Sequence, residues 1–214
     1  IYSLKENGQV LGNPSSFYIH KDWRGQSIAS KMMDYFLQLK NCHYFLLSVS
    51  PKAEEMYQHW GFKVLETHNY VFESKTKRTS DKIVFQTQNF EKALSPKLLK
   101  IYEDHKKMNC QAFWVEDQEL ILTKSFKSKS QRKYSSIIYA SGFKSLEQKG
   151  IELTSLLTAE ADQYLTVDAR FFDQNPPGAS KEPLPTARYY LSSFFKPREI
   201  QLDYSEVALI DVRP

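Results

Sequence analysis

The chain has 214 residues, of which 41% are hydrophobic and 14% aromatic, and its formal net charge is +4. This length suits one large domain or two small ones, and the hydrophobic fraction excludes an intrinsically disordered chain. The mild positive charge favours anionic ligands without requiring nucleic acid. Cys42 and Cys110, the two cysteines, lie far apart, which is typical of a reducing compartment rather than of a disulfide framework. No apolar run reaches membrane-spanning length and no signal-peptide pattern opens the chain, so we expect a soluble cytoplasmic protein.

Residues 1–12 have the pattern of two strands joined at Asn7-Gly8, a strong hairpin signal. Because the chain starts at Ile1, inside this element, we expect the natural N-terminal sequence to be absent. Residues 15–19 are short, aromatic and β-prone, and are predicted as the next strand.

The segment from Ile19 to Ser30 reads as a strand that turns directly into a helix through Arg24 and Gly25. A helix over residues 27–40 is predicted from apolar residues at helical spacing, which are Ile28, Ala29, Met32, Met33 and Phe36. The first N–H groups of such a helix have no partners within it, and they lie at the positive end of its dipole. The pattern therefore predicts a phosphate site; a plain surface turn is the alternative.

A near-continuous apolar run over residues 44–50 is typical of a central, buried strand. Ser50 and Pro51 then provide an N-cap and a proline in the first helical turn. Apolar residues follow at helical spacing, and Gly61 is placed to end this helix. Two closing strands are expected at residues 62–65 and 69–72.

The charged stretch 73–82 carries no apolar period, so it is the expected linker between domains 1–78 and 79–214. We find no internal repeat. The second domain is predicted to be an α+β region with strands at 82–87, 134–140, 164–172, 188–195 and 207–212, a helix at 95–108, a hairpin at 113–122, and loops at 124–133 and 175–185.

Two motifs in the first third of the chain resemble those of the GNAT superfamily of acyl-CoA-dependent N-acyltransferases. Residues 24–29 resemble its pyrophosphate loop, Arg/Gln-x-x-Gly-x-Gly/Ala, with Arg24 and Ala29 at the matching ends and Ser27 in place of the middle glycine. Residues 50–62 resemble its signature Asn-x-x-Ala-x-x-Leu/Phe-Tyr-x-Lys-x-Gly-Phe, with Ser50 in place of asparagine and matches at Ala53, Tyr57, Gly61 and Phe62. The resemblance covers about residues 1–72.

The resemblance implies an α/β fold, a GNAT-like mixed central sheet flanked by helices and incomplete at its N-terminus. It implies that acetyl-CoA, or another acyl-CoA, is the cosubstrate, and that its pantetheine arm lies in a splay between two parallel strands, here 15–19 and 44–50. Tyr57 would be the general acid that protonates the departing thiolate. The expected cofactor-binding residues are Ile19, Arg24, Gly25, Gln26, Ser27, Ile28, Ala29, Ser30, Ser50 and Ala53.

Direct attack by an amine is expected, because neither motif contains a cysteine that could form a covalent intermediate. The acceptor is a small-molecule or peptidyl amine that the sequence does not specify. The general base stays open, with Ser48, Ser50, Tyr18 and His43 as loose candidates. Tyr57 could instead be an ordinary core aromatic.

Histidine and cysteine spacing predicts no metal site. The basic, serine-rich stretch 124–133 could contact nucleic acid, although a solvated loop is the favoured interpretation. The substitutions at Ser27 and Ser50 leave a second hypothesis, a catalytically inactive GNAT-like scaffold that binds a protein or nucleic-acid partner.

Overall fold

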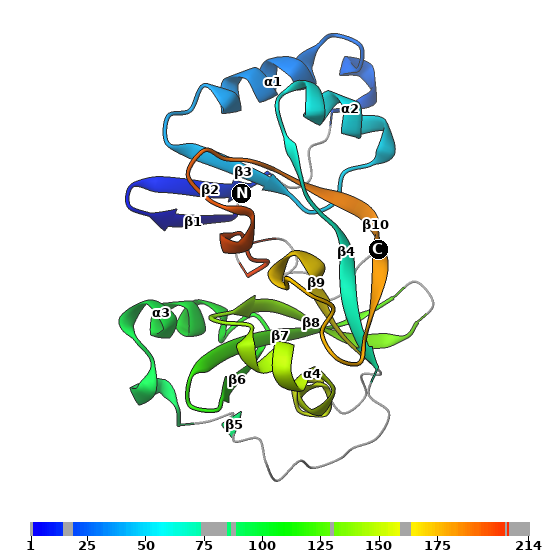
Figure 1. The fold of residues 1–214 in the computed structure, drawn as a ribbon. Coiled ribbons are helices and arrows are strands. Elements are labelled where there is room, and N and C mark those ends of the chain that lie inside the picture. Colours follow the sequence, from blue (N-terminus) through cyan, green and yellow to red (C-terminus); the bar gives the residue numbers. More distant parts are fainter. Residues whose placement is uncertain are drawn as a thin grey trace. The chain divides into compact units, whose positions relative to one another are not determined.

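A computed structural model describes residues 2–14, 19–73, 85–86, 89–128, 131–158, 164–203 and 205 (Figure 1). The chain forms two compact units, residues 1–65 with 186–200 and residues 66–185 with 201–214. No helix in the described ranges is long and apolar enough to cross a membrane.

The strands are β1 (Tyr2–Glu6), β2 (Gln9–Asn13), β3 (Cys42–Leu46), β4 (Lys63–Glu73), β5 (Phe85–Gln86), β6 (Gln111–Val115), β7 (Glu119–Lys127), β8 (Lys133–Ala140), β9 (Tyr164–Asp168) and β10 (Ala179–Leu191). The α-helices are α1 (Ile28–Leu37), α2 (Pro51–His59), α3 (Pro96–His105) and α4 (Lys144–Leu157).

The first unit begins with the predicted hairpin, β1 paired antiparallel with β2. Asn7 and Gly8 have φ values of 50° and 76°, the left-handed conformations that a tight hairpin turn requires and that asparagine and glycine tolerate. The chain then crosses through α1 to β3, which runs parallel to β2. β10 completes this sheet as the antiparallel neighbour of β3.

Both helices of the first unit pack on the same face of its sheet. Met33 of α1 and Tyr57 of α2 lie in one buried cluster with Tyr44 and Leu46, alternate residues of β3. Alternation in a strand sends successive side chains to opposite faces, so one face of β3 supplies the floor under both helices. Burial of each large apolar side chain here contributes about 1.5–3 kcal/mol.

The second unit contains a longer sheet. β6, β7 and β8 are joined by antiparallel pairing, the chain crosses through α4 to β9, and β9 runs parallel to β8. β4 is the antiparallel neighbour of β9. Leu146 and Leu153 of α4 pack with Phe113 of β6 in the core of this unit. The next residue, Trp114, stacks instead on Phe90, which contacts α3, so the two helices cover opposite faces.

The two units repeat one order of connections, although the sequence shows no repeat. Each has an antiparallel pair, a helical crossover to a parallel strand, and a fourth antiparallel strand. In both units the fourth strand comes from a part of the sequence that is not continuous with the other three strands. β10 follows β9 along the chain but pairs with β3, whereas β4 follows α2 but pairs with β9.

Several sequence predictions need correction. The two strands expected at 62–65 and 69–72 form one continuous strand, β4. β7 extends to Lys127, into the predicted basic loop. The proline-containing loop overlaps β10, whose first half is exposed, so prolines are tolerated there without loss of buried ladder bonds.

Helix α4 has no counterpart among the predicted elements. Its buried face includes Gly150, a poor helix former, between Leu146 and Leu153, and the helix is kinked at Lys149. The 78/79 boundary and the strand predicted at 207–212 lie outside the described residues. So do residues 15–18 of the strand predicted at 15–19, and its last residue, Ile19, is not in a strand. The division into 1–78 and 79–214 stays a prediction.

Replacement of Gly150 by alanine should destabilise the second unit. A Cβ at this buried position of α4 would lie 2.4 Å from Cε1 of Phe72, a contact that the packed core has no room for. Overpacking of this kind costs about 1–3 kcal/mol. We expect Gly150→Ala to lower the free energy of unfolding by this amount in urea denaturation. Gln148→Ala, at an exposed site of the same helix, should change it by less than about 0.5 kcal/mol; equal effects would contradict the packing argument.

Candidate functional site

The loop between Ile19 and α1 is held by its own side chains. The short 3₁₀ turn Lys21–Trp23 opens it. Nε of Arg24 donates a hydrogen bond to the carbonyl oxygen of Ile19 at 3.1 Å. Nε2 of Gln26 donates to the carbonyl oxygen of Asp22 at 3.4 Å. These contacts tie the Arg24 and Gln26 side chains to the preceding part of the loop.

Two residues of this loop have left-handed backbone conformations, Gly25 with φ 81° and Ser27 with φ 58°. Glycine adopts such angles without strain, whereas serine pays a steric penalty through its Cβ. Ser27 is also the residue immediately before α1, and its hydroxyl makes no capping hydrogen bond to the helix. Its conformation is therefore set by the loop rather than by a capping interaction.

The backbone N–H groups of residues 25–30 have no hydrogen-bond acceptor within the described part of the chain. The first helical bond of α1 runs from N of Lys31 to the carbonyl oxygen of Ser27. Unpaired N–H groups at the positive end of a helix dipole favour an anion, and several phosphate oxygens can accept from them together. No metal ion is needed for this kind of binding.

A pocket of about 330 Å³ lies at this loop. It is lined by Ile19, Trp23, Arg24, Gly25, Ser27, Ile28 and Ala29. Six of the ten residues predicted to bind cofactor are thus gathered at one place, and Gln26 and Ser30 belong to the same loop and first helical turn. The sequence analysis did not predict Trp23 as a lining residue; its side chain is 56% exposed. Its position as an aromatic residue directly before the motif at residues 24–29 could have indicated it.

Helix α2 carries the other predicted residues. Ser50 precedes it, and the carbonyl oxygen of Ser50 accepts a hydrogen bond from N of Ala53 at 2.8 Å. Gly61, with φ 86°, lies just beyond its end, where a left-handed residue terminates a helix. Neither Ser50 nor Ala53 lines the pocket at the loop.

Tyr57 lies on the buried face of α2. Its ring makes edge contacts with Trp60 and Phe62, at centroid distances of 5.8 and 5.4 Å. Burial raises the pKa of the Tyr57 phenol, because the phenolate is poorly solvated there. No hydrogen bond of its hydroxyl is found within the part of the chain that the structure describes.

Two neighbouring tyrosines differ from Tyr57 because their hydroxyls donate hydrogen bonds. Tyr44 donates to the carbonyl oxygen of Phe36 at 2.6 Å, and burial raises its pKa to about 12. Tyr189 of β10 donates to the Glu54 carboxylate, and its pKa is raised by burial and by that carboxylate. Both hydrogen bonds are structural contacts within the first unit. Of the three tyrosines in this cluster, Tyr57 is the one whose hydroxyl has no acceptor among the described residues.

The candidate bases are dispersed. Ser48 and Ser50 are exposed, and Tyr18 lies outside the described residues. His43 is buried on the face of β3 opposite Tyr44, where Nε2 lies 2.9 Å from Oε1 of Gln9. Phe194 stacks on the His43 ring, and burial lowers the pKa of His43, so the neutral form is favoured at pH 7.

The described residues contain no group of three histidine, cysteine or acidic side chains that could hold a metal ion. Of the basic stretch predicted as a loop, residues 124–127 belong to β7 and Lys133 begins β8, and residues 129–130 lie outside the described ranges. Oγ of Ser128 accepts a hydrogen bond from N of Arg132 at 3.1 Å.

Residues 2–64 match the acetyltransferase (GNAT) domain family, which confirms the resemblance inferred from the two motifs. Among proteins with curated functions, none matches this sequence. The fold is similar to that of a GCN5-related N-acetyltransferase from Kribbella flavida, with a TM-score of 0.51, 10% identity, and coverage of 85% of this chain and 52% of that one.

The fold is also similar to that of a GCN5-related glucosamine N-acetyltransferase region in a fungal multi-domain β-N-acetylglucosaminidase. The TM-score is 0.53, the identity 11%, and the coverage 88% of this chain and 30% of that one. This chain thus spans about half of the first protein and less than a third of the second. The prediction of an α/β, GNAT-like mixed sheet flanked by helices is confirmed.

Replacement of Ser27 by glycine should stabilise the chain. Glycine removes the steric penalty at φ 58° and restores the residue that the family motif has at this position. The gain is partly offset by the larger backbone entropy of glycine in the unfolded chain. We expect Ser27→Gly to raise the free energy of unfolding by up to about 1 kcal/mol.

Ser30→Gly is the matched control, because Ser30 lies in the first turn of α1 with ordinary helical geometry. There glycine should lower the stability by about 0.5–1 kcal/mol. Urea denaturation of both variants measures the difference, and destabilisation by Ser27→Gly equal to that of the control would contradict the strain argument.

Proposed function

We propose, from the GNAT domain matched by residues 2–64, that the first unit binds acetyl-CoA or another acyl-CoA and transfers the acyl group to an amine by direct attack. The observation that carries the proposal is the run of N–H groups at residues 25–30 that have no acceptor among the described residues. It coincides with the position where the family motif holds a pyrophosphate. The acceptor is proposed to be a small-molecule or peptidyl amine.

The loop fits a diphosphate ester chemically. Its backbone offers converging donors, and the small residues Gly25, Ser27 and Ala29 let an anion approach the main chain closely. The hydrogen bonds of Arg24 and Gln26 to the preceding carbonyl groups hold the loop in place before any ligand arrives. Such preorganisation reduces the entropy lost on binding.

The proposed reaction forms one bond and breaks another. The nitrogen of a neutral amine bonds to the thioester carbon, the C–S bond breaks, and the thiolate takes the proton of the Tyr57 hydroxyl. The proton that the nitrogen loses returns through solvent to the phenolate. The first unit needs no covalent acyl-enzyme in this scheme.

The burial of Tyr57 has two consequences for this role. Because its pKa is raised, the phenol keeps its proton throughout the neutral and mildly alkaline range. The same shift makes it a weaker acid than free tyrosine, so its proton moves only as negative charge develops on sulfur. The Tyr57 hydroxyl has no acceptor within the ranges that the structure describes, which favours the role, whereas the hydroxyls of Tyr44 and Tyr189 donate hydrogen bonds.

Acetyl-CoA should stabilise the protein through the loop at residues 25–30. At one hundred times its dissociation constant, a ligand stabilises the folded state by about 2.7 kcal/mol. In a chain of this size, this raises Tm by about 5–10 °C. Gly25→Pro removes one N–H and cannot adopt φ 81°, so we expect it to weaken acetyl-CoA binding at least tenfold in thermal-shift and calorimetric titrations.

The absence of any shift with the unmodified protein at millimolar acetyl-CoA would contradict acyl-CoA binding and favour an inactive scaffold. Tyr57→Phe serves as the control for this titration, since it alters neither the loop nor its N–H groups and should bind acetyl-CoA with unchanged affinity.

Tyr57→Phe should lower kcat by about 100-fold or more while leaving acetyl-CoA affinity unchanged, as expected for loss of a general acid. Tyr35→Phe, at a tyrosine of α1 that is 64% exposed, should leave kcat unchanged. The raised pKa of Tyr57 predicts that the unmodified enzyme loses no activity through Tyr57 deprotonation below about pH 10. Thiol release with a responsive amine, followed from pH 6 to 10, measures both effects; undiminished turnover by Tyr57→Phe would remove Tyr57 from the mechanism.

A further inference from the structure

The second unit has the same strand–helix–strand crossover as the first, β8–α4–β9, and its helix start is also placed to bind an anion. Here, however, the N–H groups have partners. The Glu119 carboxylate, on β7, accepts hydrogen bonds from N of Lys144 at 3.0 Å and from N of Ser145 at 3.3 Å. These are the first two residues of α4, and no side chain of the helix's own preceding residue caps it.

The turn before α4 is shaped for this carboxylate. A Cβ at Gly142 would lie 2.7 Å from Oε1 of Glu119, so a larger residue there would displace the carboxylate from its present position. Ser141 ties the turn to β7, because its Oγ accepts from N of Leu120 and its N donates to the carbonyl oxygen of Leu120, both at 2.9 Å. Glu119 is only 8% exposed, so its charge is compensated mainly by these N–H groups and the helix dipole.

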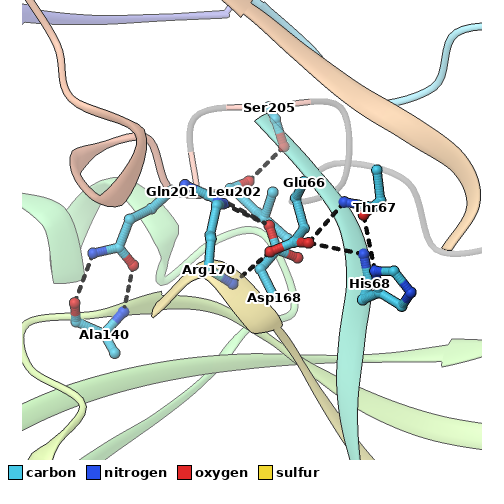
Figure 2. Close-up of polar contacts among 9 residues, drawn as sticks. All are labelled: Glu66, Thr67, His68, Ala140, Asp168, Arg170, Gln201, Leu202 and Ser205. Atoms are coloured by element: carbon cyan, nitrogen blue, oxygen red, sulfur yellow. Dashed lines mark hydrogen bonds and ion pairs between the residues drawn. The ribbon is translucent and has the colours of Figure 1, made fainter. Parts of the chain in front are cut away.

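Residues of the chain also occupy the edge of β8 that faces its parallel partner, β9. β8 and β9 pair at Ser135 and Ser136. Further along β8, N and O of Ala140 form hydrogen bonds of 2.7 Å with Oε1 and Nε2 of Gln201, as Figure 2 shows. N of Leu202 donates to the carbonyl oxygen of Ile138 at 2.8 Å. β7 occupies the other edge of β8, so residues 201–202 lie along the edge that faces β9.

The segment at residues 201–205 is itself fixed from several sides. Nε2 of His105, which is 1% exposed, lies 2.8 Å from the carbonyl oxygen of Asp203. Oγ of Ser205 donates to the carbonyl oxygen of Leu202. Beside it in Figure 2, the Glu66 carboxylate accepts from N of Thr67, His68 and Arg170, and Arg170 pairs with Asp168.

We infer that the second unit is a copy of the anion-binding crossover whose ligand positions are occupied by the chain itself. Glu119 takes the place of a phosphate at the helix start, and Gln201 with Leu202 takes the place of an extended amide-bearing arm between the strands. The site is therefore one for a carboxylate or phosphate oxyanion, filled intramolecularly. The comparison with an acyl-CoA site rests on the proposed function, whereas the internal anion site is tested without it.

Glu119→Ala should empty this site and create a response to inorganic phosphate. With phosphate at ten times its dissociation constant, we expect Tm of Glu119→Ala to rise by about 3–6 °C more than that of the unmodified protein. Glu116→Ala is the matched control. Glu116 is a nearby carboxylate that contacts the side chains of Lys149 and Ser145 but no N–H of α4, so its removal should add no phosphate response.

Equal phosphate responses of Glu119→Ala and Glu116→Ala would overturn the inference. Should Glu119→Ala fail to fold, calorimetric stoichiometry of the unmodified protein decides the matter. We expect one equivalent of acetyl-CoA, bound at least tenfold more weakly by Gly25→Pro; a second equivalent whose affinity Gly25→Pro leaves unchanged would show that the second unit is open and would overturn the inference. Absence of acetyl-CoA binding with an intact phosphate response of Glu119→Ala would instead refute the proposed function alone.

Discussion

The first N–H groups of a helix need hydrogen-bond acceptors, and this need organises both units of the protein. In the second unit β8 ends at Ala140 and α4 begins at Lys144, so the short segment between them cannot supply acceptors for all of these groups. The second unit meets the need with Glu119, from a neighbouring strand. In the first unit the corresponding groups, at residues 25–30, have no described acceptor. A crossover of the same topology thus gives a closed structural contact in one unit and a candidate ligand site in the other.

This contrast follows from side-chain chemistry more than from topology. Gly142 and Gly25 both permit close approach to the main chain, but only at Gly142 does a carboxylate of the protein lie against the position of the missing Cβ. Near Gly25, Arg24 and Gln26 donate hydrogen bonds to carbonyl groups of the preceding residues, and no described carboxylate accepts from the start of α1. A buried carboxylate with charge-assisted N–H bonds is stable, whereas exposed N–H groups depend on water or on a ligand.

Each unit takes its fourth strand from a distant part of the sequence, so the chain cannot be divided into the two units at a single point. β10 completes the sheet of the first unit and β4 that of the second, so each sheet contains a strand from the distant part of the sequence. Tyr189 shows the consequence for the proposed site. It reaches Glu54 from β10, and it thereby fixes α2, the helix that carries Tyr57, with a residue more than one hundred positions away.

The sequence by itself determined the features that depend on near neighbours. The Asn7-Gly8 turn, the start of α1 directly after the loop that contains Arg24 and Gly25, and the limits of α2 at Ser50, Pro51 and Gly61 are all local, because backbone angles and caps are set within a few residues. Only the tertiary structure decided the single long β4, the membership of 179–185 in a strand, and the role of Glu119. The acceptor for N of Lys144 lies 25 residues away, and the partner of Ala140 lies 61 residues away. Periodicity and spacing carry no information about such partners, since strand pairing rather than local propensity brings them together.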